Sequence, residues 1–218
     1  MSTIADQSSF EPGDGPRLAA LDLSSAIFHD GLRRGASRAG NRSALALESS
    51  PGTDVYHDGM EDLHRLLKPS GWVLLLVDGQ PRLVHPEGKL SFTVSSGVHV
   101  GHPNMRTRKK GLATRNGLTV PDLASNLFEE QDEKVVLELA RAASDAPFYL
   151  LVWERVTRGG NGLILELSQP ARMTDGGSVN QWADRIPVAY LDIDGDAETF
   201  SNPDHGDDEF DVSVKPRG

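Results

Sequence analysis

Residues 72–95 read WVLLLVDGQPRLVHPEGKLSFTVS and contain three short apolar segments separated by two turn sequences. The first segment is wholly apolar, and the Asp78-Gly79 pair that follows it favours the positive φ angles of a tight hairpin turn. In the third segment apolar side chains recur at every second position, as on a strand with one buried face: Leu90, Phe92 and Val94. The stretch predicts a meander of three antiparallel strands, at residues 72–77, 82–85 and 89–95.

The second half of the chain repeats this hairpin pattern. Residues 148–156 and 162–168 predict two strands joined by a glycine-containing turn, and two further strands are predicted at residues 186–193 and 210–214. Apolar positions three and four apart predict helices at residues 17–33, 58–67 and 121–144. Strands that run in pairs, with helices segregated between them, indicate an α+β fold of antiparallel hairpins packed with about three helices.

Local signals set the expected ends of the first two helices. Gly31 and Gly35 are expected to weaken and end the first helix, since glycine is a poor helix former. Asp58 and Glu61 have the spacing of a capping box, which places the start of the second helix at residue 58. Between these helices, residues 44–47 predict a short strand.

The composition is that of a folded protein without disulfides. The chain has 218 residues, 38% of them apolar, a net charge of −10 and no cysteine, which excludes disulfides, cysteine-ligated zinc and thiol catalysis. Residues 1–16 lack the features of a signal peptide and are expected to form a flexible leader. Residues 17–218 are expected to form a single domain, and two subdomains that meet near residue 120 are the alternative. The apolar runs are far shorter than the roughly 20 residues that span a bilayer, so a cytoplasmic protein without membrane association is expected.

A basic segment stands out in this acidic chain. Residues 88–121 contain no acid and six cations, so their net charge is +6 and the rest of the chain carries −16. Clustered cations of this kind favour phosphate backbones, because each neutralised phosphate releases condensed counterions. The leading interpretation is a non-enzymatic module that binds nucleic acid or another polyphosphate through a loop at residues 102–117. Its candidate binding residues are His102, Arg106, Arg108, Lys109, Lys110 and Arg115.

These residues have distinct expected roles. Arg106 and Arg108 would contact phosphates, since they project on one side of an extended segment. Lys109 and Lys110 would add positive potential, and Arg115 would anchor the following helix to the backbone. Residues 112–127 also have the spacing of a helix-turn-helix, although Asn116 stands where an apolar residue is needed and acids end the second helix.

The charge segregation has other interpretations. Residues 184–211 contain ten acids against the single cation Arg185, so the basic segment could pair with them inside the fold or across a homo-oligomer. The basic segment could equally be a solvated surface without a partner. An alternative function is a protein-interaction or inhibitor protein that engages a basic partner through its acidic segment, from Asp192 to Asp211.

Motifs for catalysis or metal binding are weaker. His99 and His102 offer two imidazoles, but a metal site needs three or four ligands, and no metal or cofactor is predicted. The acidic turn at residues 192–198 lacks the glycine and glutamate positions of an EF-hand loop. A magnesium-dependent nuclease, the second alternative, would need acids converging on one ion: Glu138, Glu166, Asp192 and Asp194. No motif specifies a reaction, so a binding protein is favoured over an enzyme.

Overall fold

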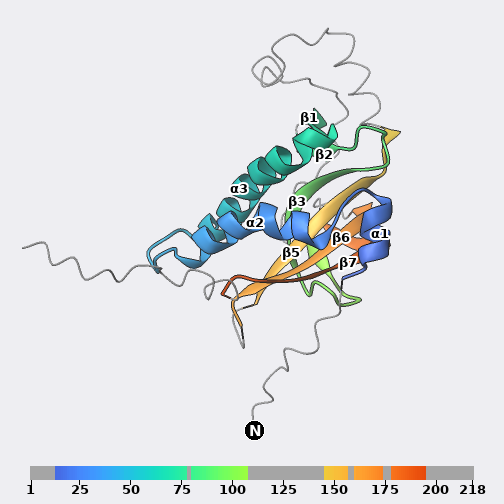
Figure 1. Ribbon diagram of the computed structural model, residues 1–218. Coiled ribbons are helices and arrows are strands. Elements are labelled where there is room, and N and C mark those ends of the chain that lie inside the picture. Colours follow the sequence, from blue (N-terminus) through green and yellow to red (C-terminus); the bar gives the residue numbers. More distant parts are fainter. Residues whose placement is uncertain (1–12, 78–79, 108–144, 157–159, 174–177, 195–218) are drawn as a thin grey trace, which may run out of the picture.

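The computed structural model describes residues 13–77, 80–107, 145–156, 160–173 and 178–194, and these residues have an α+β fold (Figure 1). They form three α-helices and a mixed sheet of seven mostly antiparallel strands. The helices are α1 (Gly15–Ala20), α2 (Ser25–Gly40) and α3 (Ser50–Leu67), with a short 3-10 turn at Lys68–Ser70. The strands are β1 (Val73–Val77), β2 (Gln80–Val84), β3 (Ser91–Val98), β4 (Arg106–Thr107), β5 (Phe148–Val156), β6 (Gly162–Met173) and β7 (Val179–Asp192).

The predicted meander is confirmed, and it forms one side of the sheet. The strand order is β1-β2-β3-β5-β6-β7, with β4 paired to β3 off this path. β1 and β2 pair antiparallel from Val73 opposite Val84 to Val77 opposite Gln80, and β2 pairs antiparallel with β3. The turn residues 78–79 lie outside the described residues.

The second hairpin is also confirmed, but its attachment to the meander differs from the expectation. β5 and β6 pair antiparallel, and β7 adds to β6 as a longer strand than predicted, beginning at Val179. β3 and β5 pair in parallel, with Ser91 opposite Phe148 and Ser96 opposite Trp153. A parallel pair requires a crossover connection and leaves no local mark in the sequence, so the hairpin pattern could not reveal it.

The first predicted helix, at residues 17–33, is wrong as a single element. The chain breaks between α1 and α2, where Asp22 adopts a left-handed φ of 56° and Leu23 is buried. Ser24 then caps α2 by accepting a hydrogen bond from the backbone N–H of Ile27 at 3.2 Å. α2 continues through both of the glycines expected to end it and stops at Gly40.

The capping box and the strand predicted between the helices are also wrong. α3 begins at Ser50 with Pro51 in its first turn, a position that proline favours. Asp58 therefore lies inside the helix, where it is buried. Residues 44–47 form a turn before α3 rather than a strand, and this turn exposes Leu45 and Leu47 by 95% and 76%.

An Arg–Asp ladder joins α2 to α3. Two arginines of α2 and a third just beyond its end, spaced four residues apart, face aspartates four residues apart on α3. Positions i and i+4 share one face of a helix. The ion pairs are Arg34 Nε with Asp62 at 2.9 Å, Arg38 Nη1 with Asp58 at 3.2 Å, and Arg42 Nε with Asp54 at 2.7 Å. The three aspartates are buried, so the ladder pairs much of the acidic charge of α3 within the fold.

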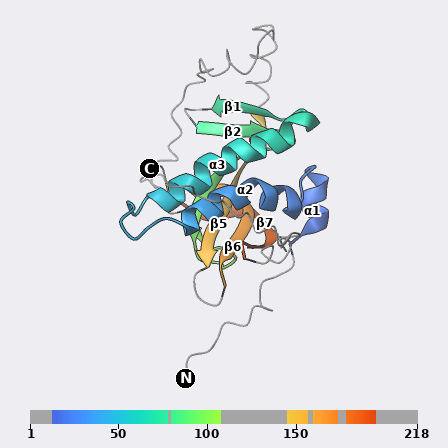
Figure 2. The ribbon, with the colours of Figure 1, turned by 60° about the vertical axis from the view of Figure 1, so that its left-hand side comes forward.

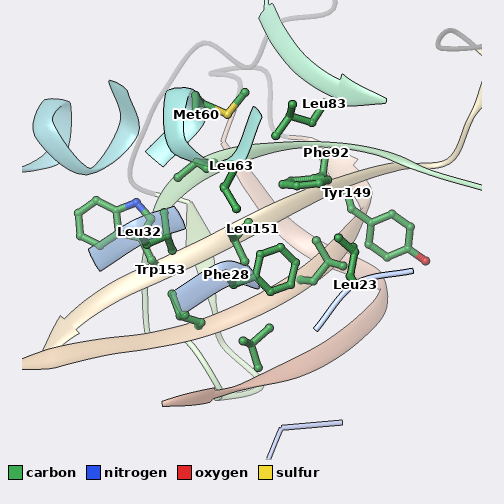
Figure 3. Close-up of a cluster of buried hydrophobic side chains, with 14 of the residues drawn as sticks. Leu23, Phe28, Leu32, Met60, Leu63, Leu83, Phe92, Tyr149, Leu151 and Trp153 are labelled. Atoms are coloured by element: carbon green, nitrogen blue, oxygen red, sulfur yellow. The ribbon is translucent and has the colours of Figure 1, made fainter. Parts of the chain in front are cut away.

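The main core lies between the helices and one face of the sheet. Figures 1 and 2 show α2 and α3 side by side across this face. Phe28 of α2 packs edge-to-face on Phe92 of β3, with ring centroids 5.9 Å apart, and Trp72 packs on the same ring at 5.6 Å. Figure 3 shows Trp153 and Tyr149 at opposite ends of this cluster, both from β5.

The opposite face of the sheet carries a second, smaller core. Leu150 and Val152 alternate along β5 with the residues of the main core, and they pack with Val100, Met105 and Val179. Val100 and Met105 belong to the segment between β3 and β4. This smaller core therefore fixes the start of the predicted basic loop to the sheet.

Candidate functional site

The first residues of the basic segment are held on the sheet by β4. Thr107 lies opposite Gly97 of β3, and Arg106 lies opposite Val98. Thr107 is buried, and its Oγ1 accepts a hydrogen bond from the backbone N–H of Val179 at 3.0 Å. Because successive side chains of a strand point to opposite faces, burial of Thr107 directs Arg106 to the surface.

The turn before β4 is fixed by contacts of its own. His99 has φ of 60° and Gly101 has φ of 85°, and the backbone N–H of Val100 donates to Glu154 Oε2 at 2.9 Å. The indole Nε1 of Trp182 donates to the carbonyl oxygen of Met105 at 3.0 Å. The backbone leading to Arg106 is thus tied to both β5 and β7.

The structure therefore exposes two of the predicted binding residues. His102 and Arg106 both lie at the surface, and Arg106 forms no ion pair with any other residue that the structure describes. The other predicted binding residues lie outside the described residues, as does the helix-turn-helix spacing at 112–127: Arg108, Lys109, Lys110 and Arg115.

The described acids of the C-terminal segment have partners other than Arg106. Asp184 pairs with Arg17 of α1 and accepts a hydrogen bond from the Tyr149 hydroxyl at 3.1 Å. Partial burial opposes its ionisation, but these hydrogen bonds outweigh that effect and keep the pKa of Asp184 below its ordinary value. Asp194 accepts a hydrogen bond from Asn161 Nδ2 at 2.9 Å. Residues 195–211 lie outside the described residues.

The acids of the nuclease hypothesis do not come together where the structure describes them. Glu166 is buried and forms a two-fold hydrogen bond with Arg185, Oε1 to Nε at 2.5 Å and Oε2 to Nη2 at 2.7 Å. Glu166 lies opposite Pro187 on β7, whereas Asp192 lies opposite Gly162, four residues away along β6. At about 3.3 Å per residue, that separation is roughly 13 Å, too far for one ion. Glu138 lies outside the described residues.

Metal-ligating side chains gather at a different place from the predicted histidines. Among the described residues Asp22, His85 and Glu87 bring their ligand atoms within 4.8 Å of one another, whereas His99 and His102 belong to no such group. His85 Nε2 lies 2.9 Å from Asp22 Oδ2, and His85 Nδ1 accepts from the backbone N–H of Glu87 at 3.0 Å. The ammonium of Lys89 lies 2.5 Å from Asp22 and 3.4 Å from Glu87. The ammonium group of Lys89 thus occupies the position of positive charge that a metal ion would take between these carboxylates. We therefore interpret the cluster as a network of ion pairs within the fold.

A cavity of about 900 Å³ lies between the first turns of α3 and the carboxyl ends of the parallel strands β3 and β5. Two of its lining residues have buried polar atoms without a hydrogen-bond partner among the described residues, Ser95 Oγ and Trp153 Nε1. Sequence reasoning missed this cavity, because it forms only where the parallel pairing brings β3 and β5 beneath α3. The predicted site leaves this cavity unexplained.

The fold and the site define the chain as an α+β protein with a mixed sheet, a helix pair on one face and a basic segment leaving the sheet at β4. No protein-family model, no curated protein and no solved structure matches it. Of the helices in the described part of the chain, none is long and apolar enough to cross a membrane.

Proposed function

We propose that the protein binds nucleic acid or another polyphosphate through the basic segment at residues 102–117, without chemistry of its own. The observation that carries the proposal is the exposed Arg106, which has no acidic partner among the described residues and sits on a backbone held by Thr107 and Met105. Because the backbone at Arg106 is already fixed, ordering on contact with a phosphate is limited to its side chain.

The charge distribution supports the same function. Residues 88–121 carry +6 in a chain of net charge −10. Several acids elsewhere are already paired, since the Arg–Asp ladder uses three aspartates and Asp184 is paired with Arg17. These ion pairs leave the net charge of −16 outside the basic segment unchanged. That charge opposes the approach of DNA or RNA at long range, so affinity should be modest and strongly dependent on salt.

A matched pair of arginine variants tests the role of Arg106. Arg106→Ala and Arg172→Ala each remove one exposed strand cation and leave the same net charge. If Arg106 contacts a phosphate, its variant should lower the magnitude of the slope of log K against log salt by about 0.9, because one fewer counterion is released. Arg172→Ala should leave the slope unchanged. Equal slopes for the two variants, measured by fluorescence anisotropy on duplex DNA, would remove Arg106 from the interface.

A further inference from the structure

The two edges of the sheet differ in how far the fold covers them. On β7, elements packed against the edge bond to its backbone along most of its length. The contacts are Val179 N with Thr107 Oγ1, Arg185 O with Arg17, Pro187 O with Asp14 N, Ala189 O with His29, and Asp192 O with Arg33. Backbone groups that are occupied in this way do not pair with a strand from another chain.

At the other edge, β1 has backbone groups that the described part of the chain leaves unpaired. Figure 2 shows β1 beyond β2 at this edge. Val77 and Gln80 flank a two-residue turn, so they form a hydrogen-bonded pair of the β1–β2 ladder. Such pairs alternate along an antiparallel ladder, which makes Leu75 the next residue bonded to β2. Leu74 and Leu76 therefore direct their N–H and C=O groups away from β2, and no described residue outside the sheet bonds to them.

The sequence of β1 also lacks the features that protect an edge strand from pairing. Charged residues, proline and β-bulges serve that purpose in natural sheets. β1 has the sequence VLLLV and pairs with β2 at all five positions without a bulge. In a chain of net charge −10, this uncharged strand lets two copies meet without bringing like charges together. The edge thus favours an apolar strand as its partner.

A second copy of β1 is such a strand, and one register satisfies both copies. When two β1 strands pair antiparallel about Leu75, Leu74 of each copy lies opposite Leu76 of the other. Every outward N–H and C=O group of Leu74 and Leu76 then has a partner. We propose that two copies of the chain form a symmetric dimer through β1, with one sheet running across both copies. A strand pair of this length lies at the low end of interface sizes, below about 1,200 Å² in total, so the dimer dissociates on dilution.

Two leucine-to-lysine variants test the dimer by analytical ultracentrifugation of the full chain over a range of concentrations. Leu76→Lys places a charge on the proposed interface, whereas Leu66→Lys makes the same change on α3, where Leu66 is 39% exposed. The wild type should dimerise with increasing concentration, and Leu76→Lys should weaken the dimer by roughly tenfold or more, because lysine on an edge strand blocks pairing. Leu66→Lys should dimerise like the wild type. A wild type that stays monomeric up to about 1 mM overturns the proposal, as do equal dimerisation constants for the two variants.

Engineered cysteines test the register, since the chain has no cysteine of its own. In the proposed pair Leu75 lies opposite Leu75 of the second copy, with Cβ atoms about 4.5–5.5 Å apart, so Leu75→Cys should form an intermolecular disulfide on mild oxidation. Leu76 lies diagonally from its counterpart, about 7–8 Å away. Leu76→Cys should therefore cross-link severalfold more slowly, although its side chain is more exposed than that of residue 75.

Gel electrophoresis without reductant measures the cross-linked fraction of each cysteine variant over time. Absence of a cross-link in Leu75→Cys overturns the proposed pairing, and so do equal rates for the two variants. If Leu75→Cys does not fold, the two lysine variants decide the proposal.

Discussion

Substitution of Gly35 by alanine tests the close packing of α2 on α3, which also shapes the cavity. A Cβ at residue 35 would lie 2.8 Å from the carbonyl oxygen of Asp54 and 2.9 Å from the Cα of Val55. Both contacts are with the backbone of α3, which cannot rotate away as a flexible side chain could. α3 would therefore have to move away from α2, disturbing both the Arg–Asp ladder and the cavity wall at Val55.

Two opposing free-energy terms set the size of the effect. Alanine gains about 1 kcal/mol over glycine in helix propensity. Overpacking costs about 1–3 kcal/mol, and rigid backbone contacts favour the upper part of that range. The net expectation is that Gly35→Ala lowers the free energy of unfolding by about 1–2 kcal/mol, measured by urea denaturation with an unchanged m-value.

Gly52→Ala is the matched control, since the same substitution on α3 would place its Cβ where nothing lies within 4 Å. It should gain up to about 1 kcal/mol of stability, because only the helix-propensity and chain-entropy effects apply. Opposite signs for the two variants support close packing of the helices. If Gly35→Ala is as stable as the wild type, the contact between α2 and α3 is not as tight as described.

Two further predictions concern buried charges. Glu166→Gln should lower the free energy of unfolding in urea by about 2 kcal/mol, because it leaves the partly buried Arg185 without its counterion. The control Glu61→Gln removes a carboxylate that is 68% exposed and should lower it by less than about 1 kcal/mol. Equal losses for the two variants would contradict the buried ion pair. The hydrogen bonds from Arg42 hold the pKa of Asp54 below its ordinary value, so the pair contributes stability above the usual carboxyl pKa of about 3.9 and loses it as the pH falls through the folded-state value. Asp54→Asn should therefore lose less stability than the wild type between about pH 5 and pH 2, and an unchanged pH dependence would exclude this contribution.

The sequence predicted those parts of the fold that local signals determine. The meander and the second hairpin follow from turn residues and alternating burial within a few positions, and both are confirmed. The start of α3 had a local signal as well, in Ser49 and Pro51, but the spacing of Asp58 and Glu61 gave a false one. Asp58 is acidic because it faces Arg38 across the helix pair rather than because it caps a helix.

The features that sequence reasoning missed depend on residues far apart in the chain. The parallel pairing of β3 with β5 joins segments on either side of residues 108–144. The four-residue spacing of Arg34, Arg38 and Arg42, and of the aspartates in α3, is visible in the sequence, but their pairing depends on the antiparallel packing of the helices. The cavity has no sequence signal, because its walls come from α2, α3, β3, β5 and β6 together. Of the basic site, His102 and Arg106 are exposed, although Arg106 lies on β4 rather than in a loop, and their binding to phosphate stays a prediction.

The most direct test of the proposed function is the salt dependence of binding to labelled duplex and single-stranded oligonucleotides, measured by fluorescence anisotropy. The wild-type chain is compared with a variant in which Arg106, Arg108, Lys109 and Lys110 are replaced by alanine. If about four phosphates are neutralised, the wild type should give a slope of log K against log salt of roughly −3.6 on duplex DNA. The variant should bind more weakly to every sequence, without a change in which sequence is preferred. Equal binding by the two proteins, or binding by neither, would contradict the proposal.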